Sequence, residues 1–125
     1  MNENIYITII SSDPEEGKNF YLKNLSFEEK FTAQENSDLR RNILTHKIAK
    51  NLEIEFSYPQ NEIEKNNIGV SGGSRYLFTI PCKNIDEIKE RLYGSKYFIH
   101  YTEAPYASFL TVQDPMGNKI CIYET

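Results

Sequence analysis

Short runs in which hydrophobic and polar residues alternate recur along this chain, and the first run leads directly into a helix. Residues 6–10 are β-branched and aromatic, which is typical of a strand. Asp13 follows where a helix N-cap is expected, and Pro14 occupies the first helical position. The helix is predicted to continue to about Leu25. Three residues spaced four apart mark its buried face: Gly17, Tyr21 and Leu25.

Three strands are predicted after this helix, at about residues 27–33, 39–45 and 52–58. The last is the clearest of the three, because its hydrophobic residues alternate with polar ones in a two-residue period. Residues 59–74 are polar and end in a glycine-rich stretch, which indicates a linker. A phosphate-binding glycine loop is disfavoured, because the stretch leads into a strand rather than a helix.

The same order of elements then begins again. A strand is predicted at residues 75–80, a helix at 84–93, and strands at 96–102, 107–113 and 119–123. Gly94 is expected to close the helix at its C-terminal end. Residues 114–118 contain proline and glycine where a hairpin turn requires them.

The two halves of the chain align with each other. They align without a gap at an offset of 70 residues, which places Tyr6 over Tyr76. Their last strands align at an offset of 66, which places residues 52–56 over residues 118–122. The pattern predicts an α+β fold in one domain, residues 1–125, built from two βαβββ modules. The modules are expected at about residues 1–60 and 75–125.

The composition argues against several classes of partner. Fourteen basic and eighteen acidic residues give a net charge of −4, which disfavours a surface for nucleic acid or anionic membranes. No apolar run is long enough to span a bilayer. The first residues do not resemble a signal peptide. Two cysteines, Cys82 and Cys121, are too few for a disulfide framework, so a cytoplasmic protein with reduced thiols is expected.

The closing segment resembles a known family. Residues 109–124 have the sequence FLTVQDPMGNKICIYE, which is similar to the closing motif of the vicinal oxygen chelate superfamily, Asp-Pro-x-Gly-Asn before a short strand. Residues 10–27 are similar to the family's opening pattern, with Ser26 where the family usually has glycine. The superfamily includes glyoxalase I, bleomycin resistance proteins and extradiol dioxygenases. The resemblance implies a curled, eight-stranded mixed sheet around a cavity that two chains commonly complete together, and hence a homodimer.

The resemblance also indicates where a metal would bind. Metalloenzymes of the superfamily typically have His or Gln on the first strand of each module and Glu on the last. These positions fall on Tyr6 and Tyr76, and on Glu55 and Cys121. Only Glu55 is a usual ligand, because a tyrosine phenol titrates near pH 10 and catalytic metal sites normally have three good ligands. No metal and no other cofactor is therefore expected.

Two further side chains carry candidate chemistry. Strand alternation predicts that Phe98, His100 and Thr102 share one face, so His100 is expected to line the cavity. A packed role is the more common one for a lone histidine on an aromatic strand, for His46 as well as for His100. Cys121 has no suitably spaced partner that would activate it as a nucleophile, which favours a small buried side chain.

The candidate ligand-binding residues are therefore Tyr6, Glu55, Tyr76, His100 and Cys121. Tyrosine rings supply stacking and cation–π attraction and Glu55 supplies charge, so the sequence predicts a metal-free protein that binds a small aromatic or cationic molecule in an aromatic-lined cavity. Bleomycin resistance proteins of the superfamily act by such sequestration. The alternative is a metal-dependent enzyme of the lactoylglutathione-lyase or dioxygenase type. A third possibility is a structural or regulatory dimer without a ligand. No catalytic residue is assigned.

Overall fold

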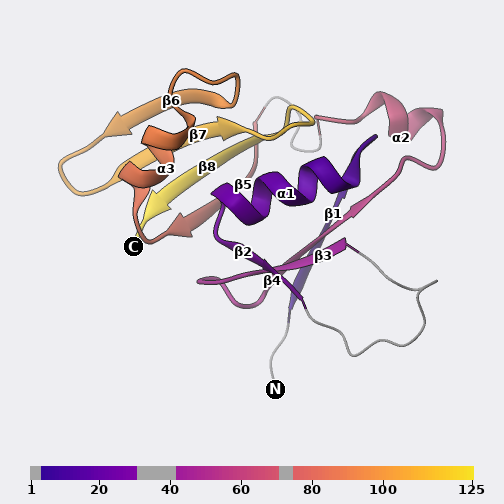
Figure 1. Ribbon diagram of the computed structural model, residues 1–125, viewed down its shortest axis with the longest axis horizontal. Helices are drawn as coiled ribbons and strands as arrows, with labels where there is room; N and C mark the ends of the chain where they lie inside the picture. The colour runs from indigo at the N-terminus through magenta and orange to yellow at the C-terminus, as the bar shows by residue number, and fades with distance from the viewer. Residues whose placement is uncertain (1–3, 31–41, 71–74) are drawn as a thin grey trace.

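Two βαβββ modules make up the fold (Figure 1). The computed structural model describes residues 4–30, 42–70 and 75–125 of the chain. The first module contains β1 (Ile5–Ile10), α1 (Pro14–Asn24), β2 (Phe27–Glu29), β3 (Asn42–His46) and β4 (Leu52–Ser57). A short helix, α2 (Glu62–Asn66), precedes the second module, which contains β5 (Tyr76–Cys82), α3 (Ile85–Leu92), β6 (Phe98–Glu103), β7 (Ser108–Gln113) and β8 (Lys119–Glu124). This order confirms the predicted modules and the α+β fold class.

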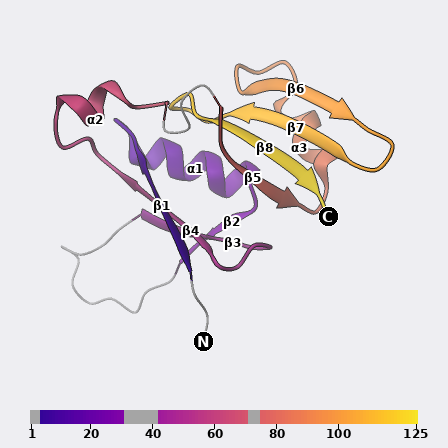
Figure 2. The same ribbon diagram turned by 180° about the vertical axis from the view of Figure 1, so that it is seen from behind.

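Each module forms its own four-stranded mixed sheet. Sheet A has the strand order β1-β4-β3-β2, and sheet B has the equivalent order β5-β8-β7-β6. In both sheets the first and last strands of the module pair in parallel, and the other neighbours pair antiparallel. Within the described residues the eight strands are thus divided between two sheets, which lie on different sides of α1 in both views (Figures 1 and 2).

The strand predictions agree with the structure apart from the ends of the strands. β2 ends at Glu29 and β3 begins at Asn42. The predicted strand residues 31–33 and 39–41 lie outside the described residues, as does the end of the predicted linker, residues 71–74.

The two long helices begin as the sequence predicts. The Asp13 carboxylate accepts a hydrogen bond from the Glu16 N–H at 3.2 Å, with proline at the first helical position of α1. The Asn84 side-chain oxygen accepts one from the Glu87 N–H at 3.2 Å at the start of α3. Gly94 has a φ of 84° after the end of α3, which is the left-handed conformation expected of a closing glycine. No helix in the described segments is long and apolar enough to cross a membrane.

The predicted linker is partly helical. Helix α2 begins after Asn61, whose side-chain oxygen accepts a hydrogen bond from the Glu64 N–H at 2.8 Å. None of the residues of α2 is buried, so no hydrophobic period marked the helix in the sequence. Gly69 has a φ of 85°, and a Cβ at this position would collide with the Met116 carbonyl. The linker therefore passes directly against the turn between β7 and β8.

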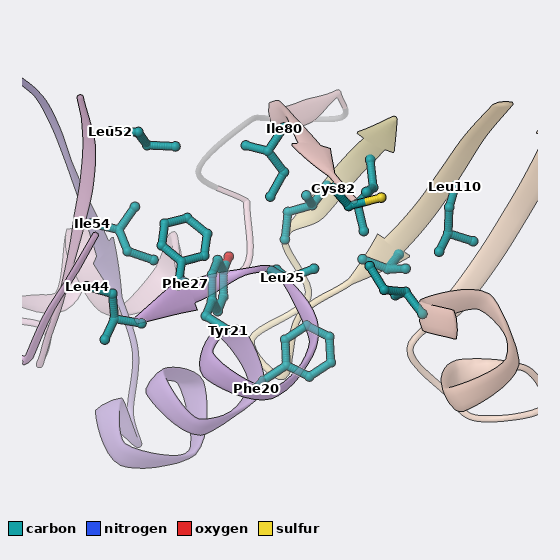
Figure 3. Close-up of a cluster of buried hydrophobic side chains, with 14 of the residues drawn as sticks. Phe20, Tyr21, Leu25, Phe27, Leu44, Leu52, Ile54, Ile80, Cys82 and Leu110 are labelled. Carbon is teal, nitrogen blue, oxygen red and sulfur yellow. The ribbon is translucent and has the colours of Figure 1, made fainter. Parts of the chain in front are cut away.

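One hydrophobic core joins the two sheets (Figure 3). Sheet A contributes Leu44, Leu52, Ile54 and Phe56, and sheet B contributes Ile80, Leu110, Val112, Ile120 and Ile122. Helix α1 lies where the sheets meet, because its Tyr21 packs edge-on against Phe56 of sheet A and Phe78 of sheet B, with ring centroids 5.1 and 6.4 Å away. Each sheet has one face that packs against this shared core, which we call its core face. The opposite face of each sheet, which we call its outer face, turns away from it.

A buried carboxylate connects the modules at the turn between β7 and β8. The Tyr21 hydroxyl donates a hydrogen bond to Asp114 Oδ2 at 2.7 Å. Asp114 Oδ1 accepts from the N–H groups of Met116, Gly117 and Asn118, at 2.9–3.0 Å. Burial raises the pKa of Asp114, and these hydrogen bonds to the charged form oppose that rise. Burial and the charge of Asp114 raise the pKa of Tyr21 well above its ordinary value, so its hydroxyl remains a donor.

His46 has a structural role at the end of β3. Its side chain is fully buried, with 0% exposure. The Nδ1 atom accepts hydrogen bonds from the N–H groups of Ile48 and Ala49, at 3.2 and 2.9 Å, which requires that Nδ1 carry no proton. Burial lowers the pKa of His46, and the carbonyl groups of Leu25 and Pro81 oppose this in part. The imidazole is therefore neutral and packed.

Replacement of Tyr21 by phenylalanine tests the contact between the modules. We expect Tyr21→Phe to lower the free energy of unfolding by about 1.5–3 kcal/mol, because a buried carboxylate loses a donor while the ring packing remains. Urea unfolding measures the change. The matched control is Tyr93→Phe, at a side chain that is 73% exposed. Equal effects of the two variants would contradict the role assigned to the Asp114 contact.

Buried His46 predicts a loss of stability in weak acid. Its folded pKa lies below the ordinary value of 6.5, so the unfolded chain takes up the proton first. The contribution of neutral His46 to the stability of the fold is complete above the ordinary pKa of 6.5, and it is lost as the pH falls toward the folded pKa. His46→Asn keeps an oxygen that can accept from the two N–H groups but does not titrate. Urea unfolding between about pH 7.5 and 5.5 should show wild type losing stability relative to this variant. A constant difference across that range would show that His46 does not titrate there.

Candidate functional site

A hollow of about 410 Å³ opens on the outer face of sheet B. Six of the described residues line it: Arg75, Tyr76, Ile99, His100, Thr111 and Lys119. They belong to the four strands of sheet B or, for Arg75, precede the first of them directly. Among the described residues, one sheet thus supplies the lining of this hollow, which we call the sheet B pocket.

Strand alternation sets the pocket face on the two central strands. In β7, Leu110 and Val112 enter the core, so Thr111 between them lies on the outer face. In β8, Lys119 and Cys121 lie on the same face as Thr111, because Cys121 is directly opposite Thr111 in the antiparallel register. Thr111 and Lys119 both line the pocket.

A β-bulge in β6 brings two neighbouring residues to the pocket. Phe98 is opposite a core residue of β7, whereas His100 is opposite Thr111, so Ile99 is an extra residue in the ladder. His100 and Thr102 therefore share the outer face, while Phe98 packs against the core. The predicted common face of the three residues is wrong for Phe98, because the bulge interrupts the alternation. Both Ile99 and His100 line the pocket.

A second bulge, in β5, directs Tyr76 outward. Tyr76 is opposite Lys119, and the ladder resumes at Phe78, so Leu77 is the inserted residue. Tyr76 consequently lies on the outer face while Phe78 reaches Tyr21 in the core. The Tyr76 hydroxyl lies 3.3 Å from Thr111 Oγ1, within hydrogen-bond distance. The two hydroxyls form a polar pair in the pocket, and the tyrosine ring is 49% exposed beside it.

Three of the candidate ligand-binding residues lie on sheet B. Tyr76 and His100 line the pocket. Cys121 is 7% exposed and is opposite Thr79 and Thr111 in the ladders on its two sides. Burial raises the pKa of Cys121, and a hydrogen bond with Thr79 opposes the rise. The side chain is thus a buried thiol rather than a thiolate, which favours the predicted packing role over that of a nucleophile.

The other two candidates lie on sheet A. Tyr6 is 67% exposed and is opposite Glu53 in the parallel ladder, whereas Glu55 is opposite Thr8. Tyr6 and Glu55 share the outer face of sheet A, but they are not direct neighbours. Because the outer faces of the two sheets turn away from a common core, one chain does not bring these residues together with the candidates on sheet B. The predicted set of five is divided between two sheets.

Sequence reasoning missed Glu53, the better-held carboxylate of sheet A. Glu53 is only 3% exposed, and Lys30 Nζ lies 3.1 and 3.2 Å from its two oxygens. Asn4 Nδ2 donates to Glu53 Oε2 at 2.7 Å. Strand alternation places Glu53 and Glu55 on the same face of β4, so the alternation that directs one carboxylate toward a site on that face also directs the other. The pocket residues Arg75, Ile99, Thr111 and Lys119 were also missed.

The residues do not fit a metal ion at the positions that the family resemblance indicates. Tyr6, Tyr76 and Cys121 replace the usual ligand types, and only Glu55 remains. Across residues 4–30, 42–70 and 75–125, no group of three or more His, Cys, Asp or Glu side chains is placed to hold a metal. This donor set offers no basis for a metal-dependent step.

Comparisons with solved structures identify the fold. A member of the glyoxalase/bleomycin resistance protein/dioxygenase superfamily from Sphaerobacter thermophilus superimposes with a TM-score of 0.62 at 22% identity, over 100% of this chain and 98% of the other. TnmS3, an antibiotic-binding protein from Streptomyces sp. CB03234, gives a TM-score of 0.65 at 18% identity, over 99% and 97%. A lactoylglutathione lyase from Agrobacterium tumefaciens gives 0.60 at 16% identity, over 96% and 91%.

These similarities concern the fold. No protein-family model matches the sequence, and no curated protein matches it at a significant level. The chain has the fold shared by glyoxalases, bleomycin resistance proteins and dioxygenases, as its closing motif suggests. Identities this low do not transfer a ligand or a reaction, because this fold hosts both binding proteins and enzymes.

Proposed function

We propose that this chain, which has the vicinal oxygen chelate fold, binds a small, flat organic molecule in the sheet B pocket without a metal ion. The pocket carries the proposal: its volume of about 410 Å³ suits a small ligand, and Tyr76 offers an exposed ring beside a pair of hydroxyls. Binding of an antibiotic by the structurally similar TnmS3 supports a ligand-binding role for this fold. Sequestration of the ligand, rather than its conversion, is the function we assign.

The lining of the pocket modifies the expected site. An aromatic-lined cavity was predicted, but Tyr76 and the imidazole of His100 are the only ring side chains among the six described lining residues. The remainder is one aliphatic residue, one hydroxyl and two cations. Such a surface binds a ring by stacking on one side and leaves its other side open.

A metal-dependent lyase or dioxygenase is the competing function. It requires about three good protein ligands around one metal, and Tyr6, Tyr76 and Cys121 do not supply them. A single carboxylate ligand, Glu55, would bind a metal too weakly to retain it. A dimer without any ligand is the third candidate, and the pocket itself argues against it.

We also propose that two chains associate through their outer faces. The sheet B pocket is open, and the outer face of sheet A exposes the large side chain of Tyr6 (67%) on β1, an edge strand of its sheet. A second chain that placed its sheet A over this sheet B would close the pocket and bring Tyr6 and Glu55 opposite Tyr76 and His100. The free, buried thiols of Cys82 and Cys121 are compatible with the proposed cytoplasmic location.

The proposed function is tested by elemental analysis and thermal unfolding. Purified protein should contain far less than one zinc, nickel, manganese or iron per chain, and these ions should not raise its unfolding midpoint. An aromatic ligand at about a hundredfold excess over its Kd should stabilise the folded protein by roughly 2.7 kcal/mol. This stabilisation should raise the unfolding midpoint by several degrees. Tyr76→Ala should reduce that increase, whereas Tyr58→Ala, at an exposed tyrosine outside the pocket, should not. About one metal per chain, lost in Glu55→Ala, would instead refute the metal-free proposal and favour the competing enzyme.

Light scattering tests the dimer. The chain has a mass of 14.6 kDa, and at micromolar concentration the protein should scatter as twice this mass. A specific interface should bury at least about 1,000 Å² in total, so a charge at its centre should weaken it. Tyr6→Arg is expected to shift the protein toward the monomer, and Tyr58→Arg is the control at a similarly exposed tyrosine, 65% against 67%. A wild-type monomer would refute this assembly.

A further inference from the structure

The sheet B pocket has an unbalanced positive charge. Arg75 and Lys119 line it, and none of its six lining residues is acidic. In the described part of the chain, neither cation forms an ion pair, whereas Lys18, Lys30, Lys89 and Arg91 all do. Both side chains are exposed at the pocket. In a protein with a net charge of −4, two unpaired cations in one hollow create a local field of the opposite sign.

The acidic side chains of sheet A do not offset this charge. Lys30 and Asn4 already bind both oxygens of Glu53. Glu55 also takes part in an interaction within its own chain. The expected preference for a cationic ligand depended on Glu55, which lies on β4 of sheet A and does not line the sheet B pocket of its own chain.

The remaining pocket groups suit the polar and flat parts of one molecule. The hydroxyls of Tyr76 on β5 and Thr111 on β7 lie 3.3 Å apart, and the one that does not donate to the other can donate to an acidic oxygen. The Tyr76 ring and the Ile99 side chain, 49% and 40% exposed, offer apolar surface for a ring. Cations, hydroxyl donors and apolar surface therefore converge on one hollow.

We infer that the sheet B pocket selects an aromatic molecule that carries an acidic group, such as a carboxylate or sulfonate. Arg75 and Lys119 attract the acid, the hydroxyl pair donates a hydrogen bond to it, and Tyr76 stacks on the ring. A neutral aromatic compound loses the charge contribution, and a cationic one is repelled. This inference rests on the proposed function and specifies the chemical class of its ligand.

Two fluorescent probes test the selection directly. Anilinonaphthalene sulfonate and phenylnaphthylamine share one ring system and differ by a sulfonate group. Titration of wild type at pH 7 should give an affinity for the sulfonate about three- to tenfold higher, because two exposed cations each contribute a small factor. The preference should shrink as salt is added. Tyr76→Ala should weaken the binding of both probes.

Charge variants locate the preference. In Arg75→Gln/Lys119→Gln the affinities for the two probes should become nearly equal, because binding of the sulfonate weakens while binding of the neutral probe is unchanged. Each single variant should lose part of the preference for the sulfonate. The matched control is Lys47→Gln/Lys83→Gln, which removes two exposed cations from a different basic hollow and should keep the preference.

The outcomes separate the two proposals. Equal wild-type affinities, or a preference that survives in Arg75→Gln/Lys119→Gln, would overturn acid selection and leave aromatic binding standing. Loss of the preference only in the control variant would overturn it as well. Binding of neither probe to folded wild type would overturn the proposed function and this inference together.

Discussion

The buried carboxylate of Asp114 holds the two modules of this chain together. One of its oxygens organises the turn between β7 and β8 through three backbone N–H groups, and the other accepts from Tyr21 of α1 and from the Asn118 amide. If α1 separated from the turn, Asp114 would keep the donors of its own turn and lose the Tyr21 hydroxyl, so the polar contact between the modules rests on the Tyr21 hydrogen bond. Tyr21 in turn contacts the core face of each sheet, and its position fixes both faces relative to α1.

This arrangement determines where a ligand can bind. Because the modules are joined through their core faces, the polar outer faces are left accessible and do not enclose a common cavity within one chain. Sheet B supplies the described lining residues of the pocket, and no described residue of sheet A is among them. The family resemblance places four positions around one metal, and here two of them lie on each sheet. Three of these four positions have lost the usual ligand types, and for that reason the donor set does not fit a metal ion.

The sequence predicted the helix caps and most strands because each depends on a local pattern of a few residues, and it predicted the module repeat because the two halves of the chain align with each other. It failed where the chain inserts a residue into a ladder. Leu77 and Ile99 occupy β-bulges, and each lies next to a phenylalanine that packs on the core. Consecutive apolar residues in a strand that should alternate were the available signal. The position of Glu55 opposite Thr8 rather than Tyr6 depends on strand register, which a pairwise module alignment does not determine.

The charges of the pocket follow from a difference between equivalent positions of the two modules. The offset of 66 residues places Glu53 of β4 over Lys119 of β8, and in the structure each is opposite the tyrosine of its own first strand. In the first module, Lys30 and Asn4 bind the carboxylate and bury it to 3% exposure. In the second module, the described residues leave the equivalent ammonium exposed and without an ion pair. A charge that is already neutralised contributes to folding, whereas an exposed one attracts solutes of opposite sign, so the second module retains the group with which a ligand can pair.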